Sequence, residues 1–412
     1  MPFTTPTPTL TPSEIIAELH NVPAVKRAFA FFEENTRQIS EDHIRLCSVP
    51  APPFGEAERA RYLCQEFLAA GLKEVCLDDE GNATGFRPGH AQSPLLAVTA
   101  HLDTVFPAGT DFSVRRSGHR LMAPGVSDDG CGLAALIALS HALRASEIST
   151  RGSLLFVGTV GEEGEGNLRG VRHLLTQGQW ANRIDAFISL DGSGVERITN
   201  GALGSRRYRV RLAGRGGHSW GDFGAANPVH ALGRAIARLV TYPAPRDPRT
   251  TFNVGRIEGG GSVNVIAREA MMDVDLRSVS TDELRRLDAF FRRAVYEAVE
   301  DENNNRRRGD RALETELQLI GDRPSGETAA DASIVMLGAE ATRSIGFEPQ
   351  LDRASTDSNI PISLGIPAIT IGAGGASGDS HTVDEWYDPR GRDLGLKRLL
   401  LLSLALVGCE KS

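Results

Sequence analysis

The chain has 412 residues, which exceeds what one ordinary hydrophobic core organises, so we expect two domains or one domain with a large insertion. Its formal net charge of -8 argues against nucleic acid or an anionic membrane as the main partner, because both favour a basic surface. The sequence contains no apolar run of roughly 18 residues and so predicts no membrane-spanning helix.

The N-terminus has neither the apolar core nor the early basic cluster of a signal peptide, and residues 1–11, which are rich in Thr and Pro, predict a disordered tail. The five cysteines are scattered and never form a C-x-x-C pair, which predicts reduced thiols rather than disulfides or a thiolate zinc site. We therefore expect a cytoplasmic protein.

An α/β domain is predicted to begin at residue 12. Apolar residues at helical spacing continue to about residue 70 and are followed by three short, continuous apolar runs. Such runs are typical of strands covered on both faces, as in a mainly parallel sheet with flanking helices. The predicted strands are residues 95–100, 154–160 and 186–190, and a buried helix is predicted at 132–143.

A different pattern begins near residue 204. Tyr208–Gly214 alternates apolar and charged residues like a half-exposed strand, and the elements after it follow the order βαββαβ of an antiparallel α+β unit. A long helix is predicted from Thr281 to about Asp301, and the charged run at 300–311 is predicted to be a solvent-exposed loop. The other predicted elements here are helix 228–240 and strands 251–257, 269–277 and 314–320.

The parallel-sheet pattern returns after residue 321, with helix 332–344, strand 366–372 and a closing helix 394–407. We therefore predict one catalytic domain made of residues 12–203 and 321–412. It is interrupted by an inserted α+β domain at residues 204–320.

His101 and Asp103 follow the first apolar run and lie two residues apart. In a strand this spacing points both side chains to the same face, where Asp103 can accept the second imidazole N–H of a metal-binding His101. The alternative is a histidine that is satisfied inside the core.

Two pairs of acids lie at the ends of other predicted elements. Asp128 and Asp129 precede a helix, so one of them is expected to cap its N-terminus while the other bridges two cations. Glu162 and Glu163 follow the second strand, where one can bind a metal while the other acts as a base. The alternative for this second pair is two ordinary surface acids.

Asp191 follows the third strand, and His381 lies near the C-terminus. Taken alone, Asp191 suits a turn before Gly192 and His381 suits an ordinary exposed position. Together, all these positions offer imidazole and carboxylate groups but no thiolate. That is the ligand set of a catalytic zinc, manganese or cobalt site.

Five motifs in this order resemble those of the M20 family of zinc-dependent aminoacylases and peptidases. The family includes tripeptide aminopeptidases, glutamate carboxypeptidases, acetylornithine deacetylases and succinyl-diaminopimelate desuccinylases. The resemblance covers nearly the whole chain after the N-terminal tail. The motifs are HLDTV, APGVSDDG, GEEGEGN, SLDG and SHTVDEW.

The resemblance implies two divalent metal ions, with zinc expected first and manganese or cobalt as alternatives. It also implies Glu162 as the general base and Asp103 as the residue that orients a histidine ligand. The implied ligands are His101, Asp128 and Asp191 for one ion and His381, Asp128 and Glu163 for the other.

The inserted domain resembles the family's lid and dimerisation domain, which implies a homodimer. His218 is implied as a donor to the oxyanion in the neighbouring subunit. Asn264 and Arg277 match positions that hold a substrate carboxylate, although Arg277 would equally suit a surface charge at a strand edge. Further substrate contacts, implied in a loop that borders the family's cleft, are Arg353, Asp357 and Asn359.

Two departures from the family pattern bear on the activity. Many relatives carry the pattern D-x-K-G after the bridging aspartate, whereas this chain lacks the lysine and has a thiol nearby, Cys131, for which a small buried hydrophobe is the simplest role. Asp191 stands where carboxypeptidases and deacylases commonly have glutamate, and in this respect the chain is similar to the aminopeptidase and dipeptidase branches.

These residues predict a two-metal hydrolase that cleaves short peptides as an exopeptidase. The main alternative is an N-acyl amino acid deacylase or a carboxypeptidase, and a more remote one is a catalytically silent metal- or peptide-binding protein. The expected partner is a small peptide or N-acyl amino acid, and neither nucleic acid nor a membrane.

Overall fold

The computed structural model describes residues 10–410, in which the chain forms two compact units. The larger unit takes the described residues up to Ala202 and those from Glu327 onward, and the smaller unit is the continuous segment Leu203–Gly326. The smaller unit thus interrupts the larger one in sequence. Residues 1–9 of the predicted tail lie outside the described residues, whereas Thr11 caps the first helix.

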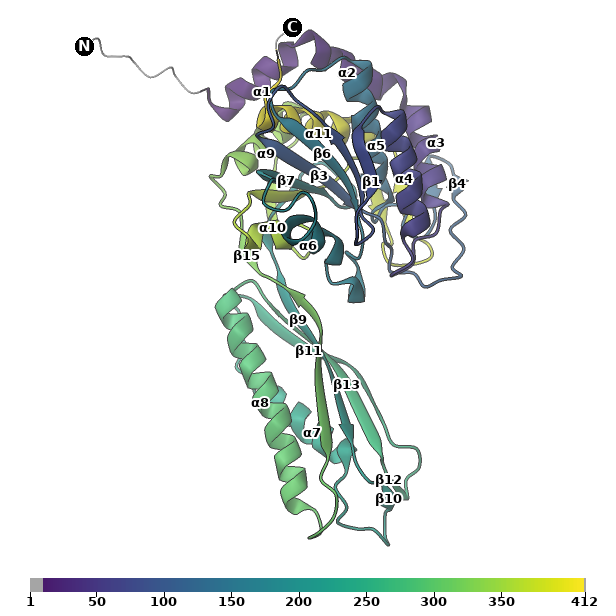
Figure 1. Cartoon of the computed structure of the whole chain (residues 1–412), viewed down its shortest axis with the longest axis vertical. Coiled ribbons are helices and arrows are strands. Elements are labelled where there is room, and N and C mark those ends of the chain that lie inside the picture. Colours follow the sequence, from purple (N-terminus) through teal and green to yellow (C-terminus); the bar gives the residue numbers. More distant parts are fainter. Residues whose placement is uncertain (1–9, 411–412) are drawn as a thin grey trace, which may run out of the picture. The chain divides into compact units, whose positions relative to one another are not determined.

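The larger unit is built around a nine-stranded sheet (Figure 1). In spatial order its strands are β1 (Lys73–Leu77), β2 (Ala83–Arg87), β6 (Ser153–Thr159), β3 (Leu95–His101), β7 (Ala186–Leu190), β17 (Ala368–Ile371), β8 (Arg197–Ala202) and β15 (Gly326–Glu327), and β16 (Gln350–Ala354) pairs with β8. The four central strands β6, β3, β7 and β17 are parallel, and β2 and β8 flank them in the antiparallel direction. This mainly parallel core confirms the predicted α/β fold.

Alternate side chains of the central strands pack into two cores, one on each face of the sheet. Leu96 and Val98 belong to the first core, and Leu95 and Ala97 to the second. Burial on both faces explains why these strands read as continuous apolar runs. Helices that cover the first core are α1 (Pro12–Asn21), α2 (Pro23–Glu34), α3 (Thr36–Cys47), α4 (Ala57–Ala69), α5 (Gly130–Ala145), α9 (Ser333–Ser344) and α11 (Arg392–Val407). The second core is covered by α6 (Arg169–Thr176) and α10 (Asn359–Ser363) (Figure 1).

A small four-stranded sheet of the larger unit joins segments that are far apart in the sequence. Its order is β18 (Ala376–Gly378), β19 (Trp386–Asp388), β5 (Arg120–Met122) and β4 (Arg115–Ser117). Because β19 pairs with β5, the loop before β19 lies beside the segment that follows β5. The sequence did not predict this pairing, since strands of three residues carry no readable periodicity.

The smaller unit is an antiparallel sheet covered on one face by two helices that lie side by side (Figure 1). Tyr208, Val210 and Leu212 point into its core and alternate with exposed or half-exposed arginines, as the sequence predicted. The element order is the predicted βαββαβ, with a short added pair of strands. Its elements are β9 (Gly204–Ala213), β10 (Gly217–His218), α7 (Pro228–Leu239), β11 (Thr250–Gly259), β12 (Val265–Ile266), β13 (Glu269–Ser278), α8 (Thr281–Asn305) and β14 (Glu314–Arg323).

The prediction of a charged loop at 300–311 is wrong in its first half, because α8 continues to Asn305. Glu302 is buried there rather than solvated. Its carboxylate accepts hydrogen bonds from Arg234 of α7 and from the backbone N–H of Asn227. A charged side chain with these partners can face a neighbouring helix, so charge alone did not mark the end of the helix.

The five cysteines are free thiols. Of the helices between residues 10 and 410, none combines the length and apolar character needed to cross a bilayer.

Candidate metal centre

The predicted site residues of the larger unit lie where neighbouring parallel strands end. Parallel strands present their carboxyl ends at one edge of a sheet, so polar residues that follow them converge there. Two further residues reach the same edge from loops. The residues are His101 at the end of β3, Glu162 and Glu163 after β6, Asp191 after β7, Asp128 before α5 and His381 between β18 and β19.

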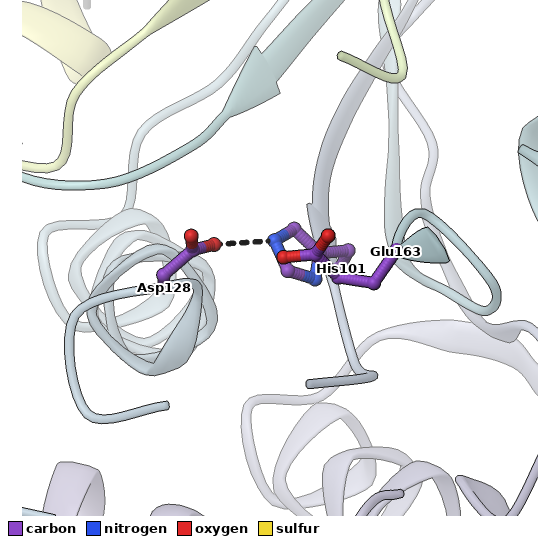
Figure 2. Close-up of side chains that lie close together, drawn as sticks. All are labelled: His101, Asp128 and Glu163. Carbon is purple, nitrogen blue, oxygen red and sulfur yellow. Dashed lines mark hydrogen bonds and ion pairs between the residues drawn. The ribbon is translucent and has the colours of Figure 1, made fainter. Parts of the chain in front are cut away.

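The two carboxylate oxygens of Asp128 face two different histidines. Oδ1 lies 2.9 Å from Nε2 of His101, and Oδ2 lies 3.0 Å from Nε2 of His381. The same His381 nitrogen lies 3.0 Å from Oε1 of Glu163. Figure 2 shows the carboxylates of Asp128 and Glu163 beside the His101 ring, and ligand atoms of these three residues all lie within 4.8 Å of one another. One carboxylate therefore links two imidazoles, which is the arrangement of a bridging metal ligand.

Hydrogen bonds with the carboxylates favour the charged form of both imidazoles. Burial alone would lower the pKa of His101, but its hydrogen bonds with Asp103 and Asp128 outweigh burial and raise this pKa well above its ordinary value. Hydrogen bonds with Asp128 and Glu163 raise the pKa of His381 to about 10. Burial would raise the pKa of Asp128, but the two histidines lower it overall. The cluster thus requires positive charge, and divalent cations fit its nitrogen and oxygen donors in place of the imidazole protons.

Asp191 adds a further acid to the same edge. Desolvation and the charge of Asp128 raise the pKa of Asp191 to about 7. Its backbone N–H donates to the carbonyl of Ile371 in β17, which fixes the start of this turn. Asp191 lies outside the tight group of His101, Asp128 and Glu163, but it interacts electrostatically with Asp128 and Glu163. A nearby cation would relieve this repulsion.

Asp103 holds the two glutamates by their backbone. Its Oδ1 accepts the N–H of Glu162 at 3.0 Å, and its Oδ2 accepts the N–H of Glu163 at 2.7 Å. Nδ1 of His101 lies 3.0 Å from the backbone carbonyl oxygen of Asp103 and 3.7 Å from Oδ1. The backbone carbonyl of Asp103 is therefore the nearer orienting partner of His101. The Asp103 carboxylate instead accepts the two backbone N–H groups of the turn after β6. Glu162 is buried and Glu163 is only partly buried.

Asp129 has the capping role expected for one member of its pair. Its Oδ1 accepts the N–H of Gly132 in the first turn of α5 and the N–H of Gly192, and its Oδ2 accepts the N–H of His101. Asp129 thus ties α5 to the ends of β3 and β7 and leaves Asp128 to face the histidines. The peptide bond between the two aspartates is cis.

The turn that carries Glu162 and Glu163 depends on a glycine. Gly161 has a φ of +68°, and a Cβ added there would lie 2.0 Å from Nη1 of Arg169. Nη2 of Arg169 in turn lies 2.9 Å from each oxygen of the buried Glu56 carboxylate. The glycine therefore allows the turn to close over this ion pair.

The loop that carries Asp128 has buried partners that the sequence did not single out. Glu385, only four residues after His381, accepts hydrogen bonds from the backbone of this loop. His43 lies 2.7 Å from the carbonyl of Val126 through Nε2, while its Nδ1 lies 2.9 Å from the Arg392 guanidinium. Because Arg is only a donor, Nδ1 accepts and Nε2 donates. The sole sequence signal was the position of Glu385 inside the motif SHTVDEW.

Cys131 is buried in the first turn of α5. Its Sγ lies 3.0 Å from the carbonyl oxygen of Ser127, to which the thiol can donate. Burial, followed by the charge of Asp129, raises the pKa of this thiol well above its ordinary value. The residue is therefore a neutral packing group beside the Asp128 loop.

In the smaller unit, His218 is an exposed residue of β10. Its Nδ1 accepts the backbone N–H of Trp220 at 3.2 Å and that of Gly221 at 3.3 Å. The proton of the neutral ring therefore sits on Nε2. Asn264 lies next to this loop, because its carbonyl oxygen accepts the N–H of Ser219.

Arg277 lies at the other end of the same unit. It is on β13, where its Nε donates to Asp275 at 2.6 Å, while β12 and its partner β10 adjoin the Glu269 end of that strand. From Glu269 to Arg277 the strand spans roughly 26 Å. The salt bridge agrees with the alternative of a surface charge, and within one copy of the unit Arg277 and His218 cannot both contact one small molecule.

The remaining candidates belong to the larger unit. Arg353 on β16 is half-exposed and pairs with Glu327. Asp357 is buried and accepts the hydroxyl of Thr159 at 2.5 Å, and Asn359 is buried and accepts the N–H of Thr356 through Oδ1. Asp357 thus ties the loop after β16 to the end of β6, and Asn359 stabilises a turn within that loop. Substrate contact by these three residues stays a prediction.

Comparison with known proteins supports the family that the sequence motifs predicted. A model of Peptidase family M20/M25/M40 matches residues 97–403. The protein YqjE of Bacillus subtilis (strain 168) is 25% identical over 358 residues, which cover 82% of this chain and 91% of that protein. Succinyl-diaminopimelate desuccinylase of Alkalilimnicola ehrlichii is 29% identical over 248 residues, but this match covers 54% of the chain and 65% of the enzyme, less than two thirds of its length.

The fold has a close counterpart among solved structures. Aminopeptidase PepT from Bacillus cereus ATCC 10987 superposes with a TM-score of 0.72 at 21% sequence identity, covering 90% of this chain and 99% of that one. The family match includes the segments that carry every clustered donor, from His101 to His381. The chain therefore belongs to peptidase family M20/M25/M40 and is a hydrolase of that family.

Proposed function

We propose that this protein is a two-metal exopeptidase that removes residues from short peptides. The observation that carries the proposal is Asp128, whose two oxygens face His101 and His381 separately. We assign one ion, zinc in the first place with manganese or cobalt as alternatives, to His101, Asp128 and Asp191. The second ion is assigned to His381, Asp128 and Glu163. When bound, the ions supply Lewis acidity and lower the pKa of the attacking water.

Glu162 is the proposed general base. It is buried beside the ligand Glu163, and Asp103 holds its backbone N–H at 3.0 Å. A base fixed in this way takes the proton from the attacking water and passes it to the leaving amine without moving its own main chain. Asp103 is accordingly a positioning residue that acts on both glutamates.

The proposed homodimer is supported by the positions of His218 and Arg277 at the two ends of the smaller unit. His218 presents an Nε2–H donor, which suits an oxyanion, and Arg277 presents a guanidinium, which suits a substrate carboxylate. Since the length of β13 separates them within one copy, they can serve one short substrate only if they come from two copies. We therefore assign His218, together with the adjacent Asn264, to the neighbouring subunit's site and Arg277 to its own.

Two kinds of observation bear on the substrate class, and each favours a different candidate. Asp191 at the fourth ligand position and the fold similarity to an aminopeptidase favour free short peptides. The match to succinyl-diaminopimelate desuccinylase, at 29% identity, favours an N-acyl amino acid deacylase as the second candidate. The free thiols, two of which are deeply buried, suit the reducing cytoplasm as the compartment.

The test is product analysis by mass spectrometry after incubation of the metal-reconstituted protein with a mixed panel. The panel holds free di- and tripeptides, N-blocked peptides, and N-acetyl, N-succinyl and longer N-acyl amino acids. Release of N-terminal residues from free peptides supports the exopeptidase. Products from the N-blocked or N-acyl compounds alone would replace it by the deacylase or carboxypeptidase.

The matched control is the Glu162→Gln variant, which should show no product within the time in which the wild type converts its substrate. Metal content is measured in parallel on both proteins. Two equivalents of metal without any product from the wild type would favour a silent binding protein and overturn the proposal.

A further inference from the structure

One buried carboxylate gathers the backbone of the loop that carries Asp128. Glu385 is fully buried, and its Oε1 accepts the N–H of Ser127 at 2.7 Å, the hydroxyl of Ser127 at 2.7 Å and the N–H of Asp128 at 2.9 Å. Its Oε2 accepts the N–H of Gly125 at 2.9 Å. Four donors thus converge on one side chain, and one of them is the main chain of Asp128 itself.

The backbone next to Glu385 secures the same loop from its other end. The carbonyl oxygen of Glu385 accepts the N–H of Ala123, which continues the pairing of β19 with β5. Both ends of the segment 123–128 are therefore attached to a single residue. A displacement of Glu385 would move the whole segment rather than one side chain.

The residue after Glu385 attaches the loop of the other ligand. Nε1–H of Trp386 donates to the carboxylate of Asp379 at 3.1 Å, and the indole ring packs on Gly378, where an added Cβ would lie 2.7 Å from the ring. Arg120 of the neighbouring strand β5 stacks over the ring. Glu385 and Trp386 thus hold the segments that carry Asp128 and His381 in one fixed relation.

We propose that Glu385 is a positioning residue of the metal centre, which fixes the main chain of Asp128 so that its two oxygens face His101 and His381 together. The inference rests on the proposed function, since it assumes that these three residues are metal ligands. Hydrogen bonds to an ionised carboxylate are roughly twice as strong as neutral ones, which suits a residue that must hold a loop against the pull of two cations. Replacing a residue that hydrogen-bonds to a metal ligand typically lowers metal affinity by about 10- to 100-fold.

An amide at position 385 gives a specific perturbation. In Glu385→Gln, the carbonyl oxygen can keep the bonds with Ser127 and Asp128, but the NH₂ group then faces the N–H of Gly125 and cannot accept it. The variant keeps most of the volume and loses one bond and the charge. The loop should shift while the surrounding core remains packed.

The matched control is Glu302→Gln in the smaller unit. Glu302 is also buried and also accepts a backbone N–H and an arginine, but it lies in the other compact unit. If Glu385 only contributes to folding, both variants should lower the melting temperature and leave metal binding unchanged. If it positions Asp128, only Glu385→Gln should alter the metal centre.

The experiment uses the full chain loaded with Co²⁺, whose visible absorption reports ligand geometry. Cobalt affinity is measured by equilibrium dialysis, and unfolding of the cobalt-free proteins by calorimetry. We expect Glu385→Gln to lose 10-fold or more in cobalt affinity and to change the absorption band, while Glu302→Gln matches the wild type in both. A folded Glu385→Gln protein with wild-type affinity and spectrum would overturn the inference.

Two further outcomes are distinguishable. If Glu385→Gln fails to fold, Ser127→Ala decides, because it removes the 2.7 Å hydroxyl bond to Glu385, together with a longer 3.4 Å contact to the hydroxyl of Ser380, and should weaken cobalt binding in the same direction. Wild-type behaviour of a folded Ser127→Ala would then overturn the inference. A wild-type protein that binds less than one equivalent of cobalt would overturn this inference together with the proposed function, whereas two equivalents bound equally by the wild type and Glu385→Gln would overturn this inference alone.

Discussion

The carboxylate of Asp103 accepts the backbone N–H of Glu162 at 3.0 Å, and this hydrogen bond joins the end of β3 to the turn after β6. The contact is made to the main chain, so it does not depend on the side chain at position 162. The other oxygen of Asp103 holds Glu163 in the same way. A substitution at either glutamate should therefore leave the turn in place and report only on the missing side chain.

Glu162→Gln should lower kcat by roughly 10²- to 10⁴-fold, because the amide cannot take a proton from water. It should keep two equivalents of metal, since Glu162 is not a proposed ligand. Glu163→Gln should lower both activity and metal content. The measurements are kcat and metal content by mass spectrometry, and full activity in Glu162→Gln would remove the assignment of the base.

Asp128 and Asp129 should differ sharply although they are adjacent. Asp128→Asn replaces the carboxylate that faces both histidines, so the variant should bind at most one metal equivalent and lose activity. Asp129→Asn keeps a side-chain oxygen for the cap of α5 but loses an acceptor, so it should lower the free energy of unfolding by about 1–2 kcal/mol and still bind metal. Equal metal content in the two variants would contradict the bridging role.

The central strands could be predicted because strands that are buried on both faces appear in the sequence as continuous apolar runs. The predicted runs 95–100 and 186–190 lie within β3 and β7, and His101 at the end of β3 belongs to the observed cluster, whereas Asp191 after β7 lies outside its tight group. By contrast, Glu385 acts on Ser127, which lies 258 residues away, through the backbone of that loop. A contact to main-chain N–H groups requires no particular side chain on the partner, so no sequence pattern predicts it.

The division of roles within the acid pairs could be predicted only as alternatives. Asp129 became the cap because its oxygens reach three backbone N–H groups, and this depends on how α5, β3 and β7 meet. Likewise α8 continues past Asp301, where Glu302 forms an ion pair with Arg234 on α7. Both outcomes follow from tertiary pairing, which overrides the local preference of a charged residue for solvent.

Mixed dimers test whether His218 serves the neighbouring subunit. His218→Ala should lower kcat by about 10²- to 10³-fold and leave metal content unchanged, because the ring is proposed to donate to the oxyanion. Glu162→Gln should be inactive for a different reason. If the two defects lie in different subunits of one site, refolding both variants together should restore part of the activity, because some dimers then hold one intact site.

The control for this experiment is each variant refolded alone, which should stay inactive. Size-exclusion chromatography with light scattering gives the oligomeric state of every sample. A monomer that is fully active, or mixed dimers with no recovered activity, would contradict the assignment of His218 to a partner.

Cys131 should resist modification in the native protein. Burial and the charge of Asp129 raise the pKa of its thiol well above normal, so almost no thiolate is present at neutral pH. Cys76 is exposed and should react first with iodoacetamide. Peptide mass spectrometry after a short exposure measures both sites. Rapid alkylation of Cys131 in the folded protein would contradict its role as a neutral packing group.

His43 predicts an acid sensitivity that arises at a residue supporting the Asp128 loop and not at a metal ligand. Its ring is buried, and burial, followed by the charge of Arg392, lowers the pKa of His43 well below 6.5. The unfolded chain therefore binds one more proton than the folded chain at pH values between that lowered pKa and about 6.5. Stability from the neutral ring is complete above pH 6.5 and is lost as the pH falls below it.

His43→Gln should remove this term, because the amide can donate to Val126 and accept from Arg392 without titrating. Between about pH 6 and pH 5 the free energy of unfolding of the wild type should fall more steeply than that of the variant, by about 1.4 kcal/mol per pH unit. Urea unfolding of both proteins at several pH values measures the difference, and the titration of the other histidines cancels in it. Parallel curves for the two proteins would mean that His43 is protonated in the folded state, which would contradict its role as a neutral donor to the Asp128 loop.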